Sequence, residues 1–390
     1  MLCQTARRRG EALMETRLID LAGLQALIDV LDRRGFTVLG PTVRDGAIVN
    51  ATIRRVADLP VGWGDDQDAA HYRLRRRDDD AVFGFASGAQ SAKPVFFPTE
   101  EVLWRGRRTP EGFDLEPSDA GADGPYALLG VRSCDLHAVG IHDTVLGGRG
   151  HQDGAYVARR EGAFVVAVSC GDPGGTCFCV SMGTGPRPQE GHGAPFDLSL
   201  TELTDGAAHR FLVEVGSDRG ADVVDEIGAG PAEPSDVTAA DQVAANAAAR
   251  MGRKLDTVGL KELLYASAES PLWDDVAQRC LACGNCTAVC PTCFCTNVED
   301  VTDLSGGESD RTRVWDSCFS ADFSHLHGGN VRESTRSRYR QWMTHKLGSW
   351  IDQFGMSGCV GCGRCITWCP AAIDITEEAA AHQRAARGEG

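Results

Sequence analysis

The sequence predicts an N-terminal domain of the α+β or α/β class, followed by a mainly helical C-terminal domain. Strand-like apolar runs alternate with helical and turn-rich stretches as far as residue 225. Residues 226–245 are rich in Ala, Asp, Glu and Pro and contain few large apolar side chains, which indicates a linker. Residues 246–390 then carry two copies of one cysteine spacing between helical segments. We therefore expect domains at 14–225 and 246–390, and a disordered or non-native extension at 1–13.

The N-terminal domain begins with a predicted amphipathic helix. Leucine and isoleucine recur at helical intervals from Leu18 to Leu31, and Gly35 is a typical helix-ending residue. A sheet flanked by helices is then predicted by a series of strand-like runs. These runs cover residues 37–39, 48–53, 82–85, 95–97, 128–131, 164–169 and 211–215.

The C-terminal domain contains the spacing C-x2-C-x2-C-x3-C-P twice, at residues 280–291 and 359–370. This spacing is the bacterial ferredoxin signature for [4Fe–4S] clusters. Three close thiolates bind one cubane, and the fourth cysteine, which precedes the proline, binds the other cubane. The sequence therefore predicts a ferredoxin-like domain with two [4Fe–4S] clusters. The predicted ligands are Cys280, Cys283, Cys286 and Cys369 for cluster 1, and Cys359, Cys362, Cys365 and Cys290 for cluster 2.

Zinc is the alternative metal for these cysteines. A structural zinc ion takes four thiolates or imidazoles, usually from two separated C-x2-C pairs. A run of three cysteines followed by Cys-Pro fits that pattern poorly, so iron–sulfur clusters are the favoured interpretation. The long, partly helical spacer between the two motifs indicates a larger and more helical domain than a small two-cluster ferredoxin.

Four more cysteines are predicted to meet at one edge of the N-terminal sheet. Cys134 follows the apolar run 127–131, and Cys170 follows the apolar run 164–168. A helical stretch separates the runs, so the strands should be parallel and their carboxyl ends should share the edge where α/β sheets bind ligands. Cys177 and Cys179 follow in a glycine-rich loop. We expect these four thiols to hold a third iron–sulfur cluster; buried structural thiols and a zinc site are the alternatives.

Besides Cys3, which lies outside every cysteine group, three cysteines are left over after these assignments, namely Cys293, Cys295 and Cys318. A structural role is favoured for them, and a role as alternative ligands or in a site completed by another residue is the other interpretation. Histidines near the motifs are not expected to bind a cluster. They are His137, His325 and His327.

A basic segment precedes the second cysteine motif and consists of Arg332, Arg336, Arg338, Arg340 and Lys346. The simpler interpretation is a solvated helix face, which we slightly favour. The alternatives are a docking surface, or positive charge beside a cluster that gains electrons.

Composition restricts the class of function. A formal net charge of −16 argues against binding of nucleic acid in bulk. The sequence has neither an apolar leader nor an apolar run of about 18 residues, so we expect a cytoplasmic protein without a membrane span. Thiols stay reduced in that compartment, which favours metal or redox chemistry for the sixteen cysteines. Phosphate-loop, dinucleotide-binding and hydrolase motifs are absent, so no catalytic residue is expected.

The chain resembles a known family most clearly at residues 132–137, 280–295, 315–319 and 358–370. In these segments it is similar to the iron–sulfur β subunit of cytoplasmic sulfhydrogenase-type [NiFe] hydrogenases. The electron-transfer subunit of anaerobic sulfite reductase shares the architecture. The resemblance extends over nearly the whole chain from about residue 16.

This resemblance implies an electron-transfer subunit of a soluble multisubunit oxidoreductase. Its implied partners are a subunit that binds FAD and NAD(P)H and the small and large subunits of a hydrogenase. The alternatives are the corresponding subunit of a sulfite reductase, with sulfite reductase subunits as partners, and a metal-stabilised docking scaffold without redox function. A self-contained enzyme that binds a flavin or a small substrate is disfavoured by the missing glycine motifs.

Overall fold

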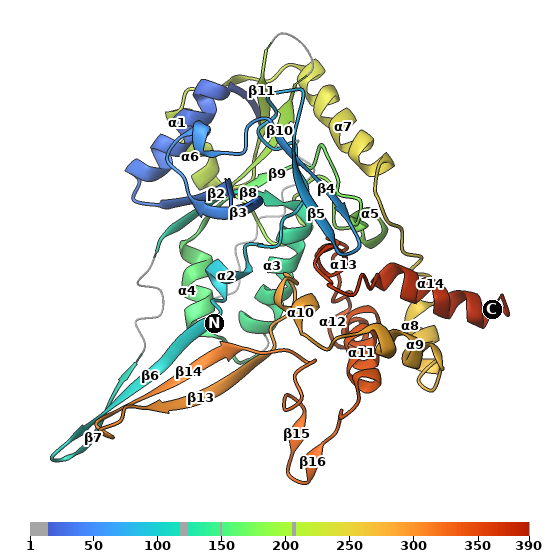
Figure 1. Ribbon diagram of the computed structural model, residues 1–390. Coiled ribbons are helices and arrows are strands. Elements are labelled where there is room, and N and C mark those ends of the chain that lie inside the picture. Colours follow the sequence, from blue (N-terminus) through green and yellow to red (C-terminus); the bar gives the residue numbers. More distant parts are fainter. Residues whose placement is uncertain (1–14, 118–123, 149, 205–207, 390) are drawn as a thin grey trace.

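The computed structural model describes residues 15–117, 124–148, 150–204 and 208–389 (Figure 1); the extension expected at residues 1–13 lies outside them. Its largest element is an eight-stranded mixed sheet with the order β12-β1-β11-β10-β9-β8-β2-β3. The pairs β2–β8, β8–β9 and β9–β10 are parallel, and the other neighbouring strands are antiparallel. The strands are β1 Thr16–Asp20, β2 Thr37–Arg44, β3 Ala47–Thr52, β8 Tyr126–Arg132, β9 Phe164–Val168, β10 Leu198–Leu203, β11 Arg210–Val215 and β12 Gly230–Pro231.

Helices bury this sheet on both faces. Along β9, Val166 and Val168 pack into the core that contains α1, whereas Val165 and Ala167 pack into the core that contains α3. This alternation follows from the two-residue period of a strand. Because both faces are buried, the central strands are continuous apolar runs. The flanking helices are α1 Leu21–Arg33, α3 Ser133–Leu146, α4 Gly154–Gly162, α6 Asp218–Glu226 and α7 Pro234–Ala249.

The first helix begins later than its periodicity predicts. Leu18 lies in β1, and α1 begins after Asp20, whose Oδ1 accepts a hydrogen bond of 2.8 Å from Gly23 N. The N-cap therefore decides where the helix begins, because it satisfies an otherwise unpaired N–H group. The helix ends at Arg33, close to the predicted stop.

Two predicted strands are wrong. Residues 82–85 form no strand, because the carboxylate of Glu202 accepts the backbone N–H groups of Val82 and Phe83 at 2.6 and 2.8 Å. The carboxylate of Glu202 thus supplies the hydrogen-bond acceptors that a neighbouring strand would otherwise provide. Residues 95–97 lie at the end of the short helix α2 Lys93–Phe96, in which Pro94 takes an early helical position.

The predicted linker at 226–245 is largely the helix α7. Alanine is the strongest helix former, and here its small side chain also allows close packing: Ala240 is fully buried against Leu203 and Leu212. Glu233 and Asp236 form a capping box at the start of the helix. The shortage of large apolar residues therefore reflects a closely packed helix and not a flexible connection.

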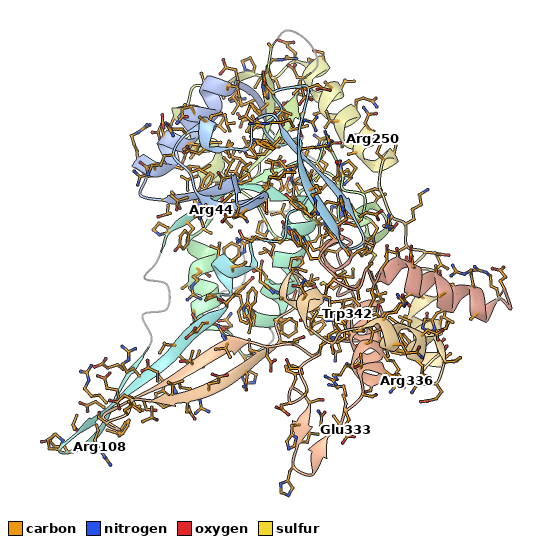
Figure 2. The ribbon with its side chains drawn as sticks, viewed as in Figure 1. Arg44, Arg108, Arg250, Glu333, Arg336 and Trp342 are labelled. Carbon is orange, nitrogen blue, oxygen red and sulfur yellow. The ribbon has the colours of Figure 1, made fainter. Side chains whose placement is uncertain are left out.

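A second sheet joins the N-terminal and C-terminal parts of the chain. Its order is β13-β14-β6-β7, and it projects as an arm whose far end carries Arg108 (Figures 1 and 2). Strand β6 pairs antiparallel with β14. At the base of the arm, Arg313 and Arg159 both pair with the buried carboxylate of Glu101. The strands are β6 Glu100–Thr109, β7 Gly112–Pro117, β13 Thr296–Thr302 and β14 Glu308–Trp315.

The C-terminal region contains short helices around an aromatic core. Trp273, Tyr339 and Trp342 are among the buried residues of this core (Figure 2 labels Trp342). Besides its helices the region contributes β13, β14 and the small hairpin β15 His325–Leu326 and β16 Gly329–Asn330, so the predicted mainly helical character is not confirmed. The helices are α8 Leu260–Ala266, α9 Leu272–Arg279, α10 Asn285–Ala288, α11 Thr335–Thr344, α12 Trp350–Phe354, α13 Arg364–Thr367 and α14 Ile375–Ala386.

The remaining elements are the hairpin of β4 Trp63–Asp68 and β5 His71–Arg76, the 3-10 turn Val56–Asp58 and the short helix α5 Cys179–Met182. Tyr72 of this hairpin stacks on Trp368 of the second cysteine motif at 5.0 Å between ring centres. Within the described ranges, no helix has the length and apolar character needed to cross a membrane.

Candidate iron–sulfur centres

The two cysteine motifs repeat the same local backbone geometry. The second residue after each leading cysteine has a positive φ, +50° at Ala282 and +65° at Gly361. This conformation directs the N–H group of Ala282 to Cys280 Sγ and that of Gly361 to Cys359 Sγ, both at 3.4 Å. Such donors stabilise thiolate ligands over neutral thiols.

A glycine in the left-handed conformation then starts a short helix in each motif. Gly284 has a φ of +73° and precedes α10, and Gly363 has a φ of +75° and precedes α13. These helices, which carry the third cysteine of each motif, pack against each other. The side-chain amide of Asn285 on α10 donates to the carbonyl oxygen of Trp368. The motifs thus fold as a pair, as cross-ligation by the fourth cysteines requires.

We name the four predicted ligands of cluster 1 set 1, those of cluster 2 set 2, and the four N-terminal cysteines set 3. All four thiols of set 1 line one pocket, and Cys365 of set 2 also lines it. Its other walls are largely apolar and include Phe319, Tyr339 and Trp342. Burial raises the pKa of Cys286 and of Cys280, whereas Cys283 is exposed. Converging buried thiols suit a metal centre, because metal coordination offsets the cost of deprotonating them.

The thiols of set 2 lie deeper in the protein. Burial raises the pKa of Cys359 to about 12 and raises that of Cys365, and the charges of Cys359, Cys362 and Cys290 raise it further. Cys290 lies close to the second motif, because Lys346 donates to Cys290 Sγ and its carbonyl oxygen accepts the N–H group of Gly358, directly before Cys359. The structure thus brings each predicted set together.

Set 3 also converges at the predicted edge of the sheet. Cys134 lies in the first turn of α3, directly after β8, and Cys170 follows the parallel strand β9. Burial, followed by the charge of Cys170, raises the pKa of Cys177 to about 12. Burial, followed by the charges of Cys170 and Cys177, also raises the pKa of Cys179. The predicted strand–helix–strand unit is therefore confirmed, and it brings the four thiols together.

Sets 2 and 3 are in contact. Cys134, Cys179 and Cys362 belong to one buried cluster of side chains, together with Trp350 and Val360. This contact arises because the glycine-rich loop of set 3 packs directly on the second cysteine motif. The two thiol sets are consequently neighbours in one continuous, water-poor region.

Backbone contacts fix this loop on the second motif. Phe178 N donates to Gly361 O at 2.8 Å, and the hydroxyl of Thr184 donates to Val360 O at 2.6 Å. A Cβ atom on Gly363 would lie 2.5 Å from Thr176 O. Glycine is therefore needed at this position for close approach as well as for its positive φ.

A buried ion pair lies between sets 2 and 3 and was not predicted. The guanidinium of Arg364 binds both carboxylate oxygens of Asp135, at 2.6 and 3.0 Å, and its Nε donates to Gly88 O at 2.7 Å. Each residue is next to a predicted ligand, Asp135 after Cys134 and Arg364 before Cys365. That adjacency is the one sequence signal that points to them.

The leftover thiols lie beside other cysteines. Cys293 lies beside Cys290 and lowers its pKa, and Cys318 lies beside Cys295 and lowers the pKa of that thiol. Cys295 and Cys318 lie at the base of the β13–β14 hairpin, where Asp316 N donates to Cys295 O at 2.9 Å. Within the described ranges, no group of three or more Cys, His, Asp or Glu side chains is close enough to hold a single metal ion. A cubane spreads its four thiolates over a larger core.

The basic segment divides into two parts. Its arginines lie on and before α11, where Arg336 pairs with Asp274 at 3.1 Å and Arg340 donates to Ala268 O at 2.6 Å (Figure 2 labels Arg336). Lys346 instead points inward and is 5% exposed. Its ammonium donates to Cys290 Sγ at 3.2 Å. The arginines therefore fit the solvated-face interpretation, and Lys346 fits that of positive charge beside a thiol set.

The three histidines near the motifs lie in two parts of the fold. His325 and His327 lie in and beside the exposed β15–β16 hairpin. His137 is on α3, where burial lowers its pKa.

A second buried ammonium, Lys93, was also missed; it donates to Cys293 O at 3.3 Å and lies 3.5 Å above the ring centre of Trp315.

Comparisons with known proteins agree with this geometry. The family model of the 4Fe–4S dicluster domain matches residues 279–373, which include sets 1 and 2. Sulfhydrogenase 2 subunit beta of Pyrococcus furiosus is 37% identical to this chain over 267 residues, which are 66% of this chain and 74% of that protein. No solved structure matches the chain.

Proposed function

Because the chain belongs to the family of sulfhydrogenase β subunits, which are iron–sulfur subunits for electron transfer, we propose that it connects a flavin subunit to a hydrogenase module. In this proposal the partner that binds FAD exchanges electrons with NAD(P)H, and the hydrogenase module contains the nickel site. The observation that carries the proposal is the convergence of three thiol sets in a row. Set 3 contacts set 2, and Cys365 of set 2 reaches the cavity of set 1.

We assign two [4Fe–4S] clusters to sets 1 and 2 and a third iron–sulfur cluster to set 3. When bound, each cluster accepts and donates one electron at a time. The chain's own residues hold the thiolates in place and exclude water from sets 2 and 3. Backbone N–H groups at Ala282 and Gly361 stabilise the leading thiolate of each motif. No residue is assigned a catalytic role.

The corresponding protein of a sulfite reductase is the second candidate within the same class. The cysteine motifs serve both assemblies equally, so the discriminating observation is whether a nickel or a sirohaem subunit co-purifies with the chain. A non-redox scaffold is the candidate from another class. It predicts metal centres whose spectra do not change with dithionite.

Iron content and redox titration test the proposal directly. The full chain, prepared anaerobically, should contain about eight irons if sets 1 and 2 are filled and about twelve if set 3 is also filled. Cys286→Ser should remove about four irons from set 1, and Cys134→Ser should remove about four from set 3. Unchanged iron in Cys134→Ser would show that set 3 consists of structural thiols. Colourless protein that contains only zinc would refute the electron-transfer role.

A further inference from the structure

Lys346 contacts both cysteine motifs that contribute thiols to set 2. It lies in the π-helical turn His345–Ser349 between α11 and α12. Its carbonyl oxygen accepts the N–H group of Gly358 at 2.8 Å, directly before Cys359. Its ammonium donates to Cys290 Sγ at 3.2 Å and to the hydroxyl oxygen of Thr292 at 3.0 Å. One residue thus fixes the start of the second motif and the fourth ligand from the first motif.

The charge of Lys346 is not neutralised by a carboxylate. Within the described ranges Lys346 forms no ion pair, and the charges that act on it most strongly are those of Cys290, Cys293 and Cys359. Arg364, another buried cation beside set 2, is paired with Asp135, and Lys93 donates to the carbonyl oxygens of Ala288 and Cys293. A buried cation without a partner is unfavourable, so a negatively charged centre at set 2 is the environment that this lysine fits.

Set 1 has no equivalent of this ammonium among the residues that the structure describes. The cysteine of set 1 that corresponds to Cys290 is Cys369, because each precedes the proline of its motif. Cys369 Sγ accepts only a backbone N–H group, from Ile373 at 3.4 Å. Two cations act on set 1 without contacting its sulfur atoms: Arg338, which is bound to the carbonyl oxygens of Phe319 and Glu333, acts on Cys280, and the charge of Lys346 itself has a smaller effect on Cys286 than burial and the neighbouring thiols have. The two sets therefore share their backbone donors, but only at set 2 does an ammonium donate directly to a cysteine sulfur among the described residues.

We propose that Lys346 raises the reduction potential of the cluster at set 2 above that of the cluster at set 1, so that electrons collect at set 2. This inference rests on the proposed function. Reduction adds one negative charge to a cluster, and a fixed positive charge beside a ligand makes that addition more favourable. Lys346 acts through Cys290 and is a positioning residue, not a catalytic one.

The test is an anaerobic redox titration of the reconstituted full chain, followed by electron paramagnetic resonance. Cys283→Ser, which removes a ligand of set 1, and Cys134→Ser, which removes one of set 3, assign the signals of the three sets. The two chains are compared at the potential where half of the set 2 cluster is reduced in the unaltered chain. At that potential the ratio of reduced to oxidised cluster should be at least about tenfold lower in Lys346→Met. For a one-electron centre this ratio corresponds to about 59 mV. The set 1 signal should move much less.

Two variants control for structural effects. Lys346→Arg retains the charge and should restore most of the potential. Lys93→Met removes a lysine that is equally buried but donates to carbonyl oxygens, and it should shift set 2 much less. If Lys346→Met fails to assemble set 2, Lys346→Gln, which keeps a donor without the charge, decides the question.

Full iron content with an unchanged set 2 potential in the uncharged variant overturns the inference, and so does an equal shift of both signals. A redox-silent unaltered chain would refute the proposed function instead. The two failures are therefore distinguishable.

Discussion

The equivalent glycines of the two cysteine motifs allow a matched test of how the set 3 loop packs on the second motif. Gly284 and Gly363 occupy the same position after the second cysteine and have φ values of +73° and +75°. Their surroundings differ. A Cβ atom on Gly284 would meet the side chain of Ser317 at 3.0 Å, whereas one on Gly363 would meet the backbone oxygen of Thr176 at 2.5 Å.

Substitution by alanine should therefore have unequal effects. Both variants place a side chain in the left-handed region, which costs about 1–2 kcal/mol. The Ser317 side chain can move away from the new methyl group, so Gly284→Ala should lower the free energy of unfolding by little more than this amount. Gly363→Ala must also displace the backbone of the set 3 loop, and overpacking adds about 1–3 kcal/mol. A total of about 2–5 kcal/mol is expected for Gly363→Ala.

The assay is urea unfolding of both variants under anaerobic conditions, followed by far-ultraviolet circular dichroism, with an iron determination on each sample. Gly363→Ala should have the lower midpoint and should lose iron from set 3 first, because its clash lies in the loop that carries Cys177 and Cys179. Equal midpoints and equal iron content in the two variants would refute the claim that the loop and the second motif are in fixed contact.

Three further predictions concern other parts of the chain. Asp135→Ala leaves Arg364 charged and unpaired in the interior, and should lower the free energy of unfolding by about 3–5 kcal/mol, measured by chemical denaturation; a double substitution to apolar residues should recover much of this loss. Glu202 raises the pKa of His209, so this pair stabilises the fold fully at pH values below the pKa of His209 in the unfolded chain. The contribution is lost as the pH rises through the pKa of His209 in the folded chain. If the unfolding midpoint of the unaltered chain depends on pH in the same way as that of His209→Gln, this prediction is contradicted. Cys318→Ser should leave iron content unchanged, and a loss of iron would assign the leftover thiols to a metal site.

The placement of the thiols could be predicted because it follows from local rules. Ligand spacing determines which cysteines of each motif face one centre. The position of Cys134 and Cys170 follows from a rule of chain connectivity, since a strand–helix–strand unit brings the carboxyl ends of its strands to one edge. These predictions needed no knowledge of long-range packing; the four thiols of set 1 line one pocket, and Cys134 and Cys170 directly follow the parallel strands β8 and β9.

Other features could not be predicted because they depend on distant partners. The pairing of β6 with β14 joins residues about 200 positions apart, and neither strand carries a signal for the other. Lysine and arginine side chains are usually solvated, and only the fold shows that Lys346 and Arg364 are buried. The helix α7 was missed because small side chains were interpreted as a lack of core contacts.

The interlocked packing has a consequence for how the chain assembles. The second motif holds set 2, supports the set 3 loop through Gly361 and Val360, and binds Asp135 through Arg364. The fourth thiol of set 2, Cys290, comes from the first motif and accepts a hydrogen bond from Lys346. The contacts that position the charged groups between sets 2 and 3 therefore all involve the second cysteine motif, a segment of a dozen residues. Because buried charges are tolerated only when their partners are in place, we expect the N-terminal and C-terminal parts of the chain to become ordered together around this segment and not as independent domains.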